Sequence, residues 1–133
     1  MSYLHLIFGL AVFVIFLATG KLMRVDFPDK TMIPPEFRIL MRSRHIYILL
    51  AAIGHVFLGL YLQLRPAVWR RALQIFGSIL LFAGGGLLVA AFFYETYAAR
   101  GFSEMSRAGV YANLAGMIFH LAGGFQLKSK GDE

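Results

Sequence analysis

Four long apolar segments, separated by short segments rich in charge, proline and glycine, dominate the pattern of this chain. They cover about residues 3–22, 45–64, 72–94 and 108–127. An α-helix of about 20 residues is roughly 30 Å long, which matches the hydrocarbon core of a bilayer. We therefore predict four transmembrane helices over these ranges.

Prolines mark where the second of these helices begins and ends. Three prolines interrupt the segment after the first apolar run, and Pro35 suits the first turn of the helix that follows. This helix is expected to begin outside the hydrocarbon and to continue into the membrane. Pro66 predicts its end at Leu64. Because the next helix is expected from about Ala72, the connection is short and the two helices should be antiparallel neighbours.

The composition agrees with a membrane protein. Hydrophobic residues make up 59% of the 133 residues and charged residues only 15%, whereas a soluble domain of this length exposes far more charge. The chain contains no cysteine, so disulfides, thiolate metal sites and thiol nucleophiles are excluded. The expected fold class is an all-α membrane protein, a four-helix transmembrane bundle formed by one domain over residues 1–133.

The formal net charge of +6 comes from thirteen Lys and Arg residues that lie almost wholly between the apolar segments. Basic segments beside membrane helices contact anionic lipid head groups, so we exclude nucleic acid and expect the lipid bilayer as a partner. Eight of the thirteen flank the side opposite the termini and five flank the side of the termini. Basic loops stay in the cytoplasm, so the termini are expected outside, and the expected location is the bacterial inner (cell) membrane.

All four histidines lie within the predicted helices or at their edges. Ionisable side chains inside a membrane are rare and mark functional candidates. From the helix rise, His55 lies roughly 13 Å and His120 roughly 10 Å inside the side of the termini, whereas His45 lies at the opposite interface. Both inner histidines belong to rows of small residues at four-residue spacing, which is typical of packed membrane helices. The rows are Ala51–His55–Gly59 and Ala108–Ala112–Gly116–His120–Gly124.

His55 and His120 admit two interpretations. In the first, they are the axial ligands of a haem b and Arg65 contacts its propionates; the general layout resembles that of small four-helix membrane cytochromes b. In the second, each neutral histidine forms a hydrogen bond to another helix. The partners available for the second interpretation are the side chains of Ser78, Asn113 and Tyr61 and backbone carbonyl groups.

Other chemistries have weaker support in the sequence. A transporter of protons or cations usually needs a carboxylate inside the membrane, and the acidic residues here lie in loops or the tail, with Glu95 closest to an apolar segment. A zinc site of His5, His55 and His120 is disfavoured because the three histidines are expected to differ in depth. The serines have no nearby His–Asp arrangement, and the glycines at 84–86 indicate helix packing.

The sequence therefore offers no catalytic residue and no metal site, and an enzyme is the less favoured outcome. The leading prediction is a small polytopic integral membrane protein of accessory or interaction type, whose partners are the bilayer and either other membrane proteins or a second copy of the chain. The alternative is a b-type haem protein in membrane electron transfer or redox sensing. A third hypothesis is a small lipid- or quinone-binding protein that uses the glycine-lined interior.

Overall fold

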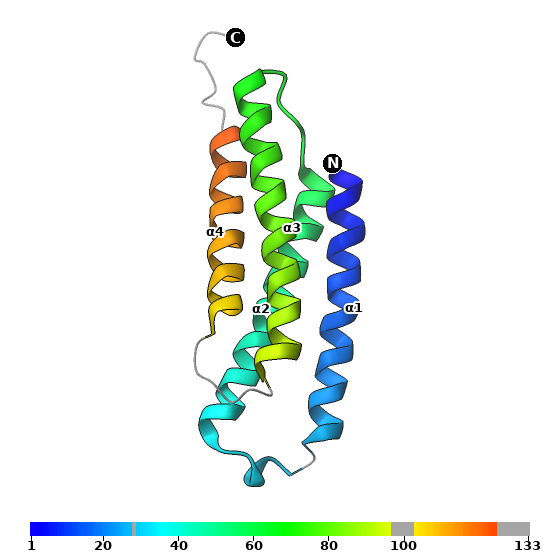
Figure 1. Ribbon diagram of the computed structural model, residues 1–133. Coiled ribbons are helices and arrows are strands. Elements are labelled where there is room, and N and C mark those ends of the chain that lie inside the picture. Colours follow the sequence, from blue (N-terminus) through cyan, green and yellow to red (C-terminus); the bar gives the residue numbers. More distant parts are fainter. Residues whose placement is uncertain (28, 97–102, 125–133) are drawn as a thin grey trace, which may run out of the picture.

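The computed structural model describes residues 1–27, 29–96 and 103–124, and its regular elements are all helices. Successive long helices run in opposite directions, so that the N-terminus lies at the same end of the bundle as the connection between the second and third helices (Figure 1). The elements are α1 (Ser2–Asp26), the short 3-10 helix η1 (Lys30–Met32), α2 (Pro35–Tyr61), α3 (Val68–Thr96) and α4 (Glu104–Gly124).

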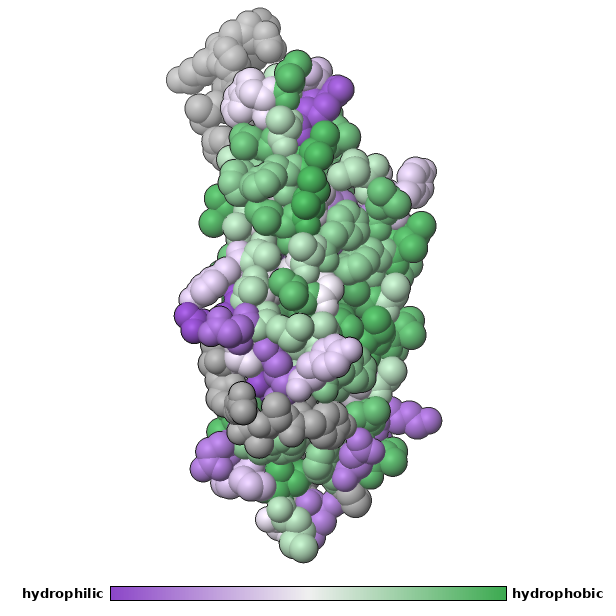
Figure 2. Space-filling view, viewed as in Figure 1, coloured by the Kyte–Doolittle hydropathy of each residue, from purple (hydrophilic) through white to green (hydrophobic). Residues whose placement is uncertain are grey.

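Three of the described helices, α1, α2 and α3, are long and apolar enough to cross a membrane. Hydrophobic residues cover most of the face seen in Figure 2, and hydrophilic residues gather toward its top and in its lower part. The helix α4 is shorter as described and carries Arg107, Asn113 and His120, which lower its apolar character. The predicted four-helix architecture is confirmed, while the crossing of a bilayer by all four helices is taken up below as a proposal.

The predicted ends of α2 and α3 were wrong by several residues. Helix α2 ends at Tyr61, before the expected Leu64, and α3 begins at Val68, before the expected Ala72. The side chain of Gln74 contacts the connection between them. Its Nε2 donates to the backbone oxygen of Gln63 at 3.2 Å, and its Oε1 accepts from the backbone nitrogen of Arg65 at 3.0 Å. These two backbone groups are thus satisfied outside a helix.

The helices pack as two antiparallel pairs, α1 with α2 and α3 with α4, and the pairs meet mainly along α2 and α3. A core cluster of Val12, Ile48, Ala52 and Phe92 joins α1, α2 and α3. The expected antiparallel contact between α2 and α3 is therefore present.

Glycines at seven-residue spacing bring α3 and α4 into backbone contact. An ideal Cβ placed on Gly77 would lie 2.8 Å from the backbone oxygen of Gly116, and one placed on Gly109 would lie 3.1 Å from that of Gly84. Gly123 continues the series on α4 and is also buried.

The predicted row of small residues on α4 was right in placing Gly116 and His120 on a packed face, since both are buried. It was wrong for Ala108, which is exposed, because the contact row passes through Gly109 instead.

Replacing Gly116 by alanine is expected to destabilise the bundle by about 1 kcal/mol through overpacking. The added Cβ would lie 2.6 Å from Cγ of Leu81 and 2.8 Å from the backbone oxygen of Gly77, so that α3 and α4 must move apart. Unfolding in mixed detergent micelles measures the effect.

The matched control is Gly86→Ala in α3, where a Cβ would meet nothing within 4 Å. Alanine favours a helix over glycine by up to about 1 kcal/mol, so this variant is expected to be as stable as the wild type or slightly more stable. Equal stabilities of the two variants would contradict the packing described here.

Candidate functional site

Three histidines from three helices meet around one serine in the interior of the bundle. Nδ1 of His5 in α1 lies 2.8 Å from Nδ1 of His55 in α2. Nε2 of His5 lies 2.9 Å from Oγ of Ser78 in α3, and the same hydroxyl lies 3.1 Å from Nε2 of His120 in α4. The exposed fraction is 0% for His5, His55 and Ser78 and 7% for His120. We call these four residues the histidine–serine cluster.

The expectation that His5 lies at a different depth from the other two histidines was wrong. His5 is three residues inside the start of α1, whereas His55 lies six residues before the end of α2. His120 lies four residues before Gly124, where the described part of α4 ends. The three positions are therefore nearly level, because α2 ends earlier than its proline predicts.

The contacts of the cluster are met together by one simple arrangement of protons. In this arrangement the hydroxyl of Ser78 donates to the backbone oxygen of Gln74 at 3.0 Å, and its oxygen accepts from Nε2–H of both His5 and His120. A neutral imidazole carries one proton, so Nδ1 of His5 is an acceptor and receives the Nδ1–H of His55. All three histidines are then neutral, as an apolar surrounding favours.

Two ring nitrogens lie outside these contacts. Nε2 of His55 and Nδ1 of His120 are buried and have no hydrogen-bond partner of ordinary length among the described groups. Nε2 of His55 faces α3, where a Cβ on Gly85 would lie 3.5 Å from it. An imidazole nitrogen that carries no proton can accept a hydrogen bond or bind a metal ion.

The rings of Phe82 and Phe8 pack against the histidines of the cluster. The ring of Phe82 stacks on His5 with the centroids 4.6 Å apart, and its centroid lies 4.9 Å from that of His55. The ring of Phe8 lies 4.5 Å from His55. His5 itself contacts the ring of His120 edge-on at 5.8 Å. The histidines are thus packed on one another and on aromatic carbon, and a flat cofactor between His55 and His120 would have to displace His5.

His45 stands apart from the cluster, as expected for its position near the other end of α2. Its Nδ1 lies 3.1 Å from Oγ1 of Thr19, and Phe16 stacks on its ring with the centroids 4.1 Å apart. The side chain is half-buried. These contacts join α2 to α1 at a second position along the helices, apart from the contact of His5 with His55.

Arg65, the residue predicted to contact haem propionates, ties the connection between α2 and α3 to the end of α4. One of its guanidinium nitrogens donates to the backbone oxygen of Gly124 at 3.0 Å. Its backbone nitrogen is held by Gln74, whose own backbone oxygen accepts from Ser78. Gln74 therefore connects Arg65 to the histidine–serine cluster through hydrogen bonds.

Of the three polar partners expected for the histidines, Ser78 is confirmed and the other two were wrong. The side-chain amide of Asn113 donates to the backbone oxygen of Gly109 in its own helix at 2.8 Å. Tyr61 is 73% exposed at the end of α2. Both residues lie on the predicted helices, but their side chains do not point toward the cluster.

A second buried polar group was missed from the sequence. Arg44 is 3% exposed, and its Nε lies 4.0 Å from a carboxylate oxygen of Glu95, which is 12% exposed. The same carboxylate accepts from the backbone nitrogen of Met105 at 2.8 Å and from Oγ of Ser106 at 2.8 Å. Glu95 lies within α3 and not in a loop, and it holds the first turn of α4 as a helix cap does.

The comparisons with known proteins add no functional information. No family model matches this chain, and no curated protein or solved structure matches it. Among the described residues, no group of three or more His, Asp or Glu side chains has the arrangement of a metal site. The contacts of the histidine–serine cluster are therefore the main basis for a functional conclusion.

Proposed function

We propose that this chain is a small integral membrane protein of accessory or interaction type, with four helices that cross the bilayer and no catalytic centre of its own. The length and apolar character of α1, α2 and α3 support the crossing. Helix α4 is fixed against α3 by backbone contacts at Gly77, Gly109 and Gly116, so it accompanies α3 into the membrane.

One observation supports a packing role for the histidines in this proposal, namely that their hydrogen bonds join helices. The contact of His5 with His55 joins α1 to α2, the contact of His5 with Ser78 joins α1 to α3, and that of Ser78 with His120 joins α3 to α4. Polar contacts between membrane helices of this kind contribute about 0.6 kcal/mol each on average, so they serve mainly to fix the packing.

In the proposed orientation, the connection between α1 and α2 faces the cytoplasm and the termini face outside. More Lys and Arg residues lie on the former side, and such residues are retained in the cytoplasm. The proposed location is the bacterial inner membrane. The proposed partners are lipid, which the large apolar side chains on the outside of all four helices would contact, and other membrane proteins or a second copy of this chain.

Haem binding is the second candidate, and two ring nitrogens outside the hydrogen bonds of the cluster favour it. Nε2 of His55 and Nδ1 of His120 are buried in the bundle, and imidazole nitrogen is an axial ligand of haem iron. Against this candidate, Nε2 of His120 is already bonded to Ser78, and a porphyrin would have to displace His5.

The visible absorption spectrum of the protein purified from membranes distinguishes the two candidates. We expect no Soret band, and we expect the protein to stay in the membrane fraction after extraction with alkaline carbonate. A Soret band that is lost in His55→Ala and His120→Ala but kept in His45→Ala would contradict the first candidate and support haem. Release of the protein by carbonate would contradict membrane insertion.

A further inference from the structure

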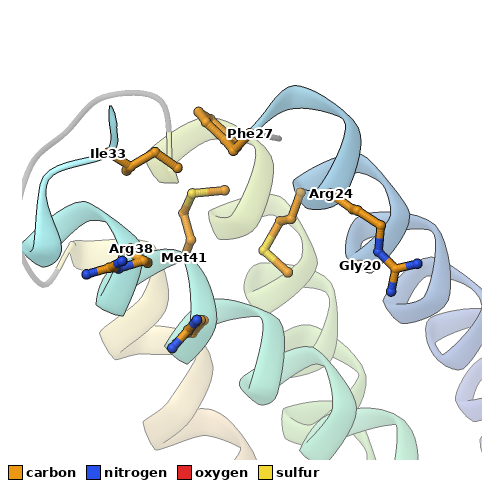
Figure 3. A pocket seen from close by; sticks show the side chains of 8 residues that line it. Gly20, Arg24, Phe27, Ile33, Arg38 and Met41 are labelled. Carbon is orange, nitrogen blue, oxygen red and sulfur yellow. The ribbon is translucent and has the colours of Figure 1, made fainter. Parts of the chain in front are cut away.

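Three arginines line a cavity of about 440 Å³ between the end of α1 and the beginning of α2. Arg24 comes from the last turn of α1, and Arg38 and Arg42 come from the first turns of α2 (Figure 3). Apolar side chains line the same space, among them Met41 and Phe27. Arg24 and Arg42 are exposed, so their charges are accessible to a ligand.

A second cavity, of about 500 Å³, adjoins the first and extends it along α1. The two share Gly20, Met23 and Arg24. The second is also lined by Leu17 and Phe16, which we call the apolar extension, and by the polar side chains of Lys21 and His45. Leu17 precedes Arg24 by seven residues, which is about 10 Å along a helix axis. The combined space therefore has arginines at the end of the bundle and the apolar extension toward its middle, with Lys21 and His45 beside it.

The nearby carboxylates Asp26 and Asp29 line a neighbouring cavity, which shares Phe27 and Ile33 with the basic one. Asp29 accepts hydrogen bonds from the backbone nitrogen of Thr31 at 2.9 Å and from its hydroxyl at 2.6 Å. Among the described residues that line the basic cavity and its extension, the charged side chains are those of Arg24, Arg38, Arg42 and Lys21, and all four are cationic.

We propose that this space binds one anionic phospholipid, with its head group at the arginine-lined end and an acyl chain along Leu17 and Phe16. A guanidinium group can donate two parallel hydrogen bonds to phosphate oxygens. The apolar extension suits a hydrocarbon chain. A free phosphate ion uses the basic end alone and leaves the apolar extension empty, so the lipid fits the whole space better. The proposal rests on the proposed membrane insertion, because the arginines then lie at the level of the head groups.

Titration of dioleoyl phosphatidylglycerol into the detergent-solubilised full-length chain, followed by native mass spectrometry, tests this site. The variant Arg24→Gln/Arg42→Gln is expected to bind this lipid about 25-fold more weakly than the wild type, at about five-fold for each charge. The matched control, Arg70→Gln/Arg107→Gln, removes two charges outside both cavities and should remain within about two-fold of the wild type. Dioleoyl phosphatidylcholine should bind at least about ten-fold more weakly than phosphatidylglycerol to the wild type.

Two results would overturn the proposal. One is an equal loss of affinity in the double variant and in its control, which would indicate an unspecific charge effect. The other is inorganic phosphate that competes as well as phosphatidylglycerol, which would indicate an anion site without a place for the acyl chain. Circular dichroism verifies that all variants are folded. Release of the wild type by alkaline carbonate would contradict the proposed function separately, because lipid titration in detergent does not require insertion.

Discussion

Glu95→Ala is expected to lower the free energy of unfolding by about 3 kcal/mol, the largest effect of any substitution considered. The change leaves the buried guanidinium of Arg44 without the carboxylate 4.0 Å away. It also removes the acceptor for the backbone nitrogens of Met105 and Ser106, at 2.8 and 3.3 Å, in the first turn of α4. Unfolding in mixed micelles, followed by circular dichroism, measures the loss.

The control for this variant is Glu104→Ala, which removes a carboxylate from the same end of the bundle. Glu104 is 92% exposed and lies 3.5 Å from Arg107, a surface pair of the kind that contributes about 0–1 kcal/mol. Glu95→Gln, which keeps an acceptor oxygen but loses the charge, should fall between the alanine variant and the wild type. A Glu95→Ala variant as stable as Glu104→Ala would show that Arg44 and α4 do not depend on this carboxylate.

Ser78→Ala is expected to have the second largest effect, a loss of about 2 kcal/mol. The hydroxyl is the acceptor for Nε2 of both His5 and His120, and both donors would remain buried without it. The control is Ser43→Ala, at a half-buried serine of α2 outside the cluster, for which a change below about 0.5 kcal/mol is expected. A loss no greater than that of the control would mean that the hydroxyl does not hold the histidines.

Helix number and order could be predicted because long apolar segments and prolines are local signals. Pro35 begins α2 as expected, since proline fits the first turn of a helix. The end of α2 could not be predicted in the same way. The connection that follows is held by the side chain of Gln74, which bonds to Gln63 and Arg65, and such a contact is not visible in hydrophobic periodicity.

In the candidate site, too, the features with local sequence signals could be predicted and those that depend on distant contacts could not. His55 and His120 were placed in the interior because small residues share their helix faces, and both are buried. His5 was set apart, because depths counted from predicted helix ends carry the errors of those ends. The contact of Arg44 with Glu95 joins residues 51 positions apart, and a single sequence carries no signal for such a pair. The alternating directions of the helices did indicate that these two residues lie at the same end.

A double-mutant cycle between Ser78 and His120 tests the central claim, that the histidines act as a junction between helices, most directly. The variants are Ser78→Ala, His120→Leu and the combination of the two, each unfolded in the same mixed micelles. The 3.1 Å contact between Oγ and Nε2 predicts a coupling energy of about 1 kcal/mol, so the double variant should lose less stability than the two single losses combined. Strictly additive losses would show that the two side chains do not interact and would contradict the account.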